Sequence, residues 1–263
     1  MTAPVRVVSA GLLEPALALA LDEAVVRAEP DSPALVLWHT RRAVVIGRFQ
    51  RADWEVDAAA CAARGVRVWR RFTGGGAVYL DPGTLCAGIV VPAGHPDAAL
   101  GVPDLYAPFL DGMAAACRAL GVAAERDERT VRVDGRKVTG VAAHRGRRAT
   151  LVHGTLLVEA DLGALSACLA GPRGGSLDAR PRPAPSRPDT VANLGVGMAA
   201  ARAAVARAFA GEGAAAEAPS ARELELVAEL RRGRYADPAW HAGPWHDVTS
   251  GEVSAVLGEE RPS

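Results

Sequence analysis

The stretch Arg70-Arg71-Phe72-Thr73-Gly74-Gly75-Gly76-Ala77-Val78-Tyr79 joins two predicted strands, at 66–70 and 76–80, through three consecutive glycines. A residue without a Cβ adopts positive φ readily and lets a ligand approach the backbone closely. Successive N–H groups of this kind can form an anion-binding nest, and the guanidinium of Arg71 can add a bidentate contact to phosphate or carboxylate. The stretch is neither a P-loop nor a Gly-x-Gly-x-x-Gly motif. Alone, it is equally consistent with a hairpin turn that needs glycine only for geometry.

Lys137 is the only lysine among the 30 basic residues, and all the others are arginines. Lysine is a compact, strongly hydrated point charge, whereas arginine is a planar fork. A site that requires a small cation beside a carboxyl or phosphoryl group does not accept that exchange. The neighbours Gly135-Arg136-Lys137-Val138-Thr139-Gly140 place the lysine between two glycines in a predicted strand. Lys137 is therefore our candidate catalytic residue.

Composition narrows the class of protein. The 263 residues fit one large domain, or a domain with a small appendage. The 30 basic and 30 acidic residues balance, which gives no general argument for a nucleic-acid or membrane partner. No apolar run approaches the roughly 20 residues that span a bilayer, and residues 1–10 lack the features of a signal peptide. The scattered cysteines form no CxxC pair and favour reduced thiols in a cytoplasmic protein, without a metal site; they are Cys61, Cys86, Cys117 and Cys168.

Hydrophobic periodicity predicts an α+β fold with a mixed or antiparallel central sheet flanked by helices. Two short runs, 34–38 and 43–46, are split by a polar turn and have the pattern of a hairpin. Asp134-Gly135 predicts a tight turn between two further strands. Helices are predicted at 12–28, 55–64, 106–120, 161–170, 197–210 and 221–232, and the other strands at 66–70, 76–80, 84–91, 129–134, 136–142 and 149–158.

Residues 171–190 are rich in glycine, proline and arginine and show no periodicity, which predicts a mobile loop or linker. Two interpretations stay open: a loop that closes over a ligand and excludes water, or a solvated linker. Ser220 is placed to cap the helix that follows it, so 211–263 reads as a short helical extension. The loop's arginines are Arg173, Arg180, Arg182 and Arg187.

Several motifs together, in this order, resemble the lipoate–protein ligase family. The resemblance covers roughly residues 12–210, and the Gly-Arg-Gly-Arg-x-Gly-Arg type loop of the related biotin ligases is absent. It predicts a catalytic domain at 1–210, with 211–263 in place of a large accessory domain. The matching segments are Leu19–Glu23, Val44–Gln50, Arg70–Tyr79, Gly135–Gly140, His153–Leu157 and Ser186–Leu194.

The resemblance implies two half-reactions. Lipoate or octanoate and Mg-ATP give an acyl-adenylate, and a lysine of a lipoyl domain then attacks the acyl carbon. The acceptors would be lipoyl domains of 2-oxoacid dehydrogenases or the glycine cleavage H protein. Lys137 would bridge the acyl carbonyl and the α-phosphate, where negative charge accumulates, and Mg²⁺ would sit on the phosphates with few protein ligands. The residues implied for ATP are Arg71, Gly75, Gly76, Ala77, Val78, Tyr79 and Asp127, and those implied for the acid are Arg71, Gly76, Lys137, Thr139, His153, Gly154 and Thr155.

The chain departs from the family pattern after the glycines. Where the family usually has His-Asp-x-Gly-Asn-Leu-Asn, this sequence reads Leu80-Asp81-Pro82-Gly83-Thr84-Leu85-Cys86. Two alternatives therefore remain: an ATP-independent octanoyl or lipoyl transferase, which needs an accessible cysteine thiolate, and a non-catalytic lipoate- or nucleotide-binding relative. The sequence also leaves open whether a separate accessory protein completes the enzyme or the catalytic domain is complete as it is.

Overall fold

The computed structural model describes residues 4–169, 186 and 188–242. A six-stranded sheet in the order β10-β11-β6-β2-β1-β12 forms its centre. The strand β1 is parallel to β2 and β12, whereas the other neighbours are antiparallel, so the predicted mixed sheet of an α+β fold is confirmed. Its strands are β1 (Arg6–Leu13), β2 (Ala34–Thr40), β6 (Thr84–Pro92), β10 (Thr139–Arg145), β11 (Ala149–Leu157) and β12 (Ala216–Glu217).

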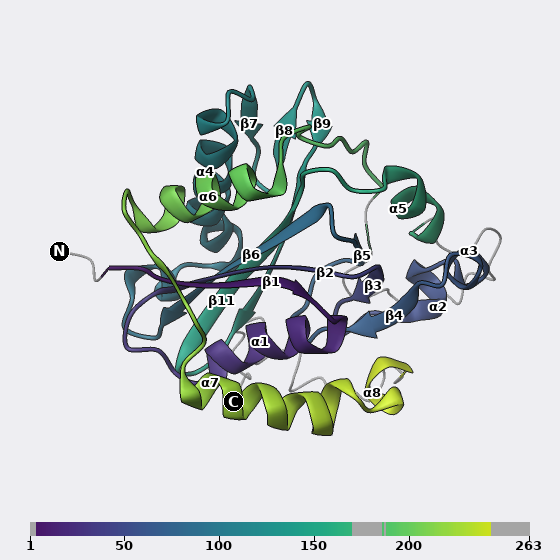
Figure 1. Cartoon of the computed structure of the whole chain (residues 1–263), viewed down its shortest axis with the longest axis horizontal. Coiled ribbons are helices and arrows are strands. Elements are labelled where there is room, and N and C mark those ends of the chain that lie inside the picture. The colour runs from purple at the N-terminus through teal and green to yellow at the C-terminus, as the bar shows by residue number, and fades with distance from the viewer. Residues whose placement is uncertain (1–3, 170–185, 187, 243–263) are drawn as a thin grey trace, which may run out of the picture.

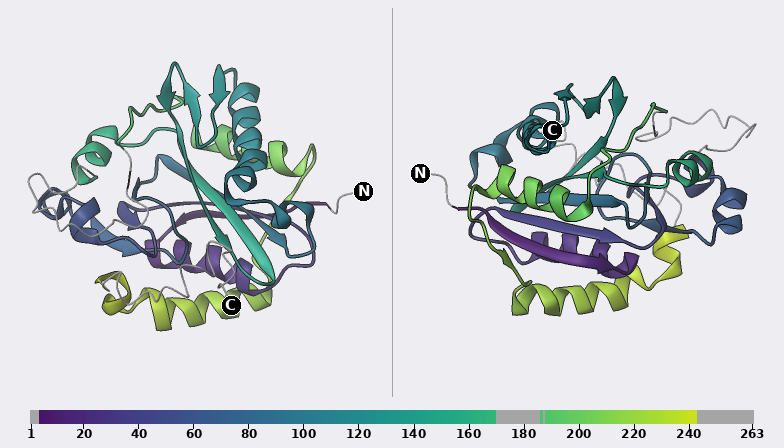
Figure 2. Two further views of the ribbon diagram at one scale, coloured as in Figure 1. Left: turned by 180° about the vertical axis from the view of Figure 1, so that it is seen from behind. Right: turned by 45° about the horizontal axis from the view of Figure 1, so that its top comes forward.

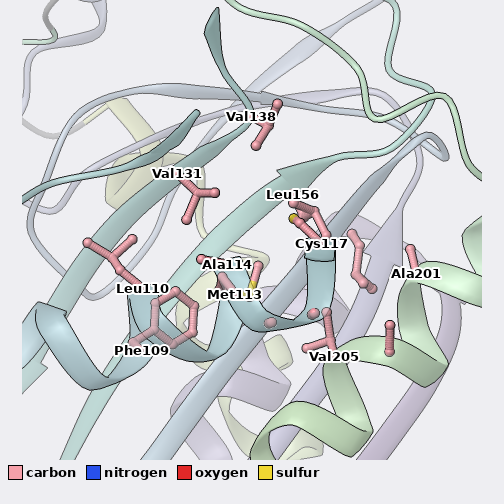
Figure 3. Packing of buried hydrophobic residues seen from close by; sticks show 14 of the residues in the cluster. Phe109, Leu110, Met113, Ala114, Cys117, Val131, Val138, Leu156, Ala201 and Val205 are labelled. Atoms are coloured by element: carbon pink, nitrogen blue, oxygen red, sulfur yellow. The ribbon is translucent and has the colours of Figure 1, made fainter. Parts of the chain in front are cut away.

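Helices cover both faces of this sheet, which explains why β2 is a continuous apolar run with both of its faces buried. The helices α4 (Val102–Ala119) and α6 (Met198–Ala210) pack on one face, where Phe109, Met113 and Leu156 belong to one buried cluster (Figure 3). The helices α1 (Pro15–Arg27) and α7 (Ala221–Leu230) lie side by side on the other face (Figure 1). The central sheet thus separates two hydrophobic cores.

A second, three-stranded sheet lies beside the first and has the order β4-β3-β5 (Figure 2). Its strands are β3 (Ala43–Ile46), β4 (Arg67–Arg70) and β5 (Val78–Leu80). The predicted hairpin of 34–38 with 43–46 is wrong, because β2 and β3 belong to different sheets. Both edges of β2 are taken by β1 and β6, so the chain after Thr40 turns away to pair β3 with β4 and β5.

A third sheet contains β7 (Ala124–Arg126), β8 (Val131–Val133) and β9 (Arg136–Lys137). The predicted tight turn joins β8 and β9, and both of its residues have positive φ, 49° at Asp134 and 71° at Gly135. The strand β9 continues after Val138 into β10, so Lys137 lies where the third sheet meets the central sheet. The helix α5 (Leu162–Cys168) follows β11.

The remaining elements refine the predicted boundaries. The helix predicted at 55–64 is two short helices, α2 (Ala52–Glu55) and α3 (Ala58–Ala63), because Val56 and Asp57 are extended and Asp57 caps α3. Ser220 caps α7 as predicted, with a reciprocal capping box to Glu223. The chain also forms η1 (Pro96–Ala99), the π-helical turn η2 (Arg231–Tyr235) and α8 (Pro238–Ala242). Among the described residues no helix combines the length and apolar character needed to cross a membrane.

Candidate active site

A cavity of about 830 Å³ lies where the second sheet, the third sheet and α5 meet. Its wall mixes apolar side chains with hydroxyls, two carboxylates and two cations, so it suits a ligand that is apolar at one part and anionic at another. The lining residues are Trp54, Glu55, Ala77, Val78, Tyr79, Arg136, Lys137, Val138, Thr139, Gly140, Thr155, Leu157, Leu165, Ser166, Leu169, Ser186, Pro188, Asp189, Thr190 and Val191.

The backbone of Lys137 is fixed on both sides. Its N–H donates to the carbonyl of Thr190 at 2.8 Å, and its carbonyl accepts from Ala192 at 3.0 Å. A Cβ placed on Gly140 would lie 4.0 Å from the Lys137 Nζ and 3.5 Å from the Thr155 Oγ1. The amine therefore lies beside Gly140 on the face of β10 and β11 that carries Thr155, and Lys137 borders the cavity.

The charges around Lys137 come from the third sheet and from residues 188–191. Burial lowers the pKa of Lys137, an effect that Asp189 opposes, Arg132 reinforces and Asp127 opposes. No ion pair within the described residues includes the amine, which leaves this cation available to an anionic ligand. Asp189 itself is held by Arg132 through two hydrogen bonds of 3.0 and 2.8 Å.

The glycine loop, residues 71–77, packs with no room for side chains at two places. A Cβ on Gly47 would lie 2.1 Å from the carbonyl oxygen of Gly75. Gly75 has φ of +86°, and a Cβ there would lie 2.8 Å from that of Ala142. The amides of Gly74 and Gly76, like that of Gly75, have no hydrogen-bond partner among the described residues. The loop is thus held by its close contacts and keeps three free donors, as an anion-binding nest requires.

Arg71 supports this loop from inside. Its guanidinium donates to the carbonyls of Gly74 at 2.6 Å, Gly76 at 2.8 Å and Val45 at 3.3 Å, and to the Thr73 hydroxyl at 2.9 Å. Burial lowers its pKa to about 10. The side chain does not border the cavity, so here Arg71 shapes the loop rather than presenting its charge to a ligand.

His153 also reaches the loop from behind. Its Nε2 lies 2.8 Å from the Thr73 Oγ1, and its Nδ1 lies 3.2 Å from the Asp22 Oδ2. The other oxygen of Asp22 accepts from the Trp38 indole at 2.7 Å. A proton on Nδ1 satisfies both contacts of the ring, because the Thr73 hydroxyl then donates to Nε2. This relay places the first helix behind the glycine loop and keeps His153 away from the cavity lining.

Two other predicted residues have mainly backbone roles. Gly154 permits close strand packing, since a Cβ there would lie 2.2 Å from the carbonyl oxygen of Gly140. Asp127 accepts from the amides of Arg129 and Thr130 at 2.8 and 2.9 Å and pairs with Arg132. Its carboxylate thus fixes the turn between β7 and β8 and does not line the cavity.

Ser186 and Glu55 border the cavity and were not predicted to do so. The Ser186 hydroxyl accepts from the amide of Ala77 at 2.8 Å and from the Gln50 side chain at 3.2 Å. Its amide donates to the Glu55 Oε2 at 3.1 Å. These contacts join segments more than 100 residues apart, and no local sequence signal announces them.

Two hydroxyls beside the cavity are buried without a hydrogen-bond partner among the described residues, those of Tyr79 and Thr139. Burial raises the pKa of Tyr79 to about 12, so the phenol keeps its proton at neutral pH. An unsatisfied buried hydroxyl costs free energy, which a polar ligand group within reach would recover.

All four cysteines are buried and free, as the reduced-thiol interpretation predicts. Burial raises the pKa of Cys86 well above its usual value, with a smaller contribution from Asp22. Cys86 is part of the core behind the loop, so the stretch Leu80–Cys86, which departs from the family pattern, offers no exposed thiolate.

In the same stretch Asp81 accepts from the amides of Gly83 and Asp161 and fixes the turn before β6.

Part of the predicted mobile loop, 171–185 with Arg173, Arg180 and Arg182, lies outside the described residues, as do Arg187 and the extension beyond 242. Across the described part of the chain, no three acidic, histidine or cysteine side chains converge as metal ligands would.

A family model described as the lipoyl protein ligase A/B catalytic domain matches residues 14–210. Lipoate-protein ligase A subunit 1 of Thermoplasma acidophilum is 32% identical over 169 residues, which are 59% of this chain and 63% of that protein. The matched region spans between 37% and 63% of the curated relatives' own length.

Solved structures agree with this match. A bipartite lipoate protein ligase from Thermoplasma acidophilum, studied with its E2 lipoyl domain, has a TM-score of 0.77 and 27% identity, covering 91% of this chain and 96% of that one. A lipoate-protein ligase A bound with ATP has a TM-score of 0.76 and 27% identity, covering 92% and 99%. A candidate lipoate protein ligase from T. acidophilum with bound lipoic acid has a TM-score of 0.76 and 25% identity, covering 92% and 100%.

Proposed function

Because the chain belongs to the lipoyl protein ligase A/B catalytic-domain family, we propose that it is an ATP-dependent ligase that activates lipoate or octanoate and transfers the acyl group to a lysine of a lipoyl domain. The observation that carries the proposal is the cavity, which is bordered by the unpaired Lys137 amine, by the end of the glycine loop at Ala77 and by apolar side chains. The apolar lining residues include Val78, Leu157, Leu165 and Leu169.

The first half-reaction brings two anions together. A carboxylate oxygen of the acid attacks the α-phosphorus of ATP, a C–O–P linkage forms, and the bond to pyrophosphate breaks. Fixed cations lower this barrier because they act where negative charge accumulates. Lys137, with Arg136 beside it on the cavity wall, supplies that charge. Gly74, Gly75 and Gly76 do not line the cavity themselves; their free amides, next to Ala77 on its wall, are further donors without a net charge.

In the second half-reaction the neutral amine of the acceptor lysine attacks the acyl carbon, AMP leaves with the bonding electrons, and the new amide nitrogen loses a proton. Lys137 stabilises the leaving phosphate in this step. The apolar lining holds the acyl chain, and burial of each methylene contributes about 0.8 kcal/mol. The acceptor would be a lipoyl domain of a 2-oxoacid dehydrogenase or of the glycine cleavage system.

ATP and Mg²⁺ differ in the evidence that supports them: a relative binds ATP, whereas no group of described residues resembles a metal site. The ATP-bound relative supports ATP as co-substrate. Glu55 and Asp189 are the carboxylates among the lining residues, and both are engaged, by the Ser186 amide and by Arg132 respectively. The described residues thus offer no ready-made magnesium site, so Mg²⁺ would enter on the triphosphate, and no step above depends on protein ligands to it.

The test combines the protein, Mg-ATP, lipoate or octanoate, and an unmodified lipoyl domain, whose mass is then measured. Wild type should add one acyl group only when ATP is present. Lys137→Arg keeps the charge but not the compact amine, and should reduce the rate by at least about 100-fold on the scale of lost transition-state electrostatics. Arg147→Lys, at a position outside the cavity lining, is the matched control and should leave the rate unchanged.

The outcomes separate the alternatives. An acyl shift from an acyl-carrier donor without ATP would identify a transferase. No shift with any acid or donor, even after candidate accessory proteins are added, would overturn the ligase proposal. Release of pyrophosphate without acyl transfer would support the first half-reaction and refute the second.

A further inference from the structure

The C-terminal segment Ala221–Ala242 lies outside the family match at 14–210. It nevertheless packs against α1 and against β4, the strand that leads into the glycine loop. The helix α7 runs along α1, and α8 reaches β4 (Figure 1). On α1, the buried carboxylate of Glu23 accepts from the Tyr235 hydroxyl at 2.7 Å and pairs with Arg234 and Arg27. The segment is therefore fixed to the body of the protein before it reaches β4.

At β4 the segment forms hydrogen bonds with the backbone of Arg70, the residue before the glycine loop. The Arg70 amide donates to the His241 Nδ1 at 3.0 Å, and the Trp240 indole donates to the Arg70 carbonyl at 2.9 Å. The Arg70 Nε donates to the Trp240 carbonyl at 2.9 Å. The ring of His241 also packs edge-on against Trp69, with 4.8 Å between ring centres. Residues of α8 thus bind both the amide and the carbonyl of Arg70.

The buried guanidinium of Arg70 connects the segment to the turn at 47–50, which packs against the glycine loop. Its Nη1 donates to the carbonyls of Gly47 at 3.2 Å, Arg48 at 2.8 Å and Gln50 at 2.6 Å. Gly47 is the residue whose missing Cβ makes room for the carbonyl of Gly75. A continuous series of contacts therefore runs from α8 through Arg70 and the turn at 47–50 to the glycine loop.

The hydrogen bonds of His241 define its protonation. Its Nδ1 accepts from Arg70, so the proton of the neutral ring is on Nε2, which donates to the carbonyl of Tyr235 at 3.1 Å. Burial lowers the pKa of His241, which favours this neutral form. An asparagine at this position would present an amide oxygen near the place of Nδ1, whereas an alanine would leave the Arg70 amide without an acceptor.

We propose that Trp240 and His241 are positioning residues for the glycine loop, which they hold in place through Arg70. This inference deepens the proposed function, since it rests on the glycine loop as the part of the site that receives the acid and the nucleotide. Neither residue borders the cavity, so both act through Arg70 and not on the ligand.

Hydrogen–deuterium exchange tests the inference without ligase activity. The probes are the amide of Arg71, which donates to Ile46, and that of Arg48, which donates to the glycine loop at Thr73. His241→Ala should speed exchange at these two amides by about tenfold, the effect of losing one buried hydrogen bond. His241→Asn should restore exchange to within about twofold of wild type, because it keeps the acceptor. Trp240→Phe keeps the ring and loses the donor, and should give a smaller local increase.

A general loss of stability would look different. Amides of β2 and β6, in the central sheet, should exchange as in wild type in all three variants. Uniform faster exchange across the protein, no change at Arg48 and Arg71, or failure of His241→Asn to restore them would overturn the inference. If wild type performs the ATP-dependent reaction, His241→Ala should raise the KM for ATP or the acid more than it lowers kcat. If wild type performs no reaction, the exchange result still decides the positioning role.

Discussion

Replacing Gly75 by alanine tests whether the glycine loop has one permitted conformation. Gly75 has φ of +86°, a backbone conformation that is strained for alanine. Placing a side chain in the left-handed region costs roughly 1–2 kcal/mol. The new Cβ would lie 2.8 Å from the Ala142 Cβ and 2.9 Å from a guanidinium nitrogen of Arg71. Five hydrogen bonds hold that guanidinium, so it cannot move away freely.

The size of the effect follows from these contacts. Ordinary contact between carbon atoms is about 3.5–4.0 Å, so the loop or the strand β10 must retreat by roughly 1 Å. Overpacking of this kind costs about 1–3 kcal/mol. The two effects together give about 2–5 kcal/mol. For a protein of this size, each kcal/mol lowers the Tm by roughly 2–4 °C, so Gly75→Ala should lower the Tm by about 4–20 °C. Calorimetry measures this directly.

The same loop provides its own control. A Cβ on Gly74 would meet the Phe49 ring at 3.8 Å, an ordinary contact, and Gly74 is not at positive φ. Gly74→Ala should therefore change the Tm by less than about 2 °C. Ala142→Gly combined with Gly75→Ala removes the overlap with the Ala142 Cβ but neither the contact with Arg71 nor the backbone strain, and should recover only part of the lost Tm. Equal melting temperatures for the two single variants would refute a loop fixed by close packing.

Three further predictions concern the groups around the loop. Arg132→Lys loses the bidentate hydrogen bonding to Asp189. The exposed ion pair contributes little to stability, so the Tm should stay within about 2 °C, whereas the KM for ATP should rise several-fold in steady-state kinetics. An unchanged KM would contradict a role for Asp189 beside the ligand. His153→Phe leaves the Thr73 hydroxyl, which still accepts from Arg71, without an acceptor for its own proton, and should cost about 1–3 kcal/mol in urea unfolding at pH 8. The cost should exceed that of His153→Gln, and the reverse order would contradict the relay. Burial, with a smaller effect of Arg48, lowers the pKa of His144 from 6.5 to about 4. Between these pH values the unfolded chain binds a proton that the folded chain does not, so the free energy of unfolding should be full above pH 6.5 and fall by up to about 3 kcal/mol between pH 6.5 and 4. His144→Phe should reduce this pH dependence in urea unfolding measured across the range.

The sequence predicted the elements whose signal is local and missed those that depend on distant partners. The helices α1, α4 and α6 can be recognised from the apolar periodicity of their own residues, and the turn can be recognised from Asp134-Gly135. The strand β1, between β2 and the short edge strand β12, alternates weakly and has exposed residues near its end, so its sequence gives little periodic signal. The false hairpin shows the same limit: two strands adjacent in sequence pair only if an edge of each is free.

The site divides in a similar way. The lone lysine was a compositional signal, and Lys137 does border the cavity together with Thr139 and Thr155. Glu55 came from no pattern, and Ser186 stood in a matching segment without a predicted role at the site, because their contacts join remote segments. A motif indicates which residues gather near a site, but burial and hydrogen bonding decide which of them face the ligand.

The two arginines of the motif explain why a chain so rich in arginine keeps one lysine. Arg70 and Arg71 are both buried, and each spreads its donors over several backbone carbonyls around the loop. A planar fork with five N–H groups suits a cluster of fixed acceptors, whereas a lysine offers three donors from a single atom and would leave some carbonyls unsatisfied. The converse holds at Lys137, where the described residues place no such cluster around the amine and the residue borders the cavity. The same difference in donor geometry thus suits the arginines to the support of the loop and the lysine to the ligand contact that the proposed ligase requires.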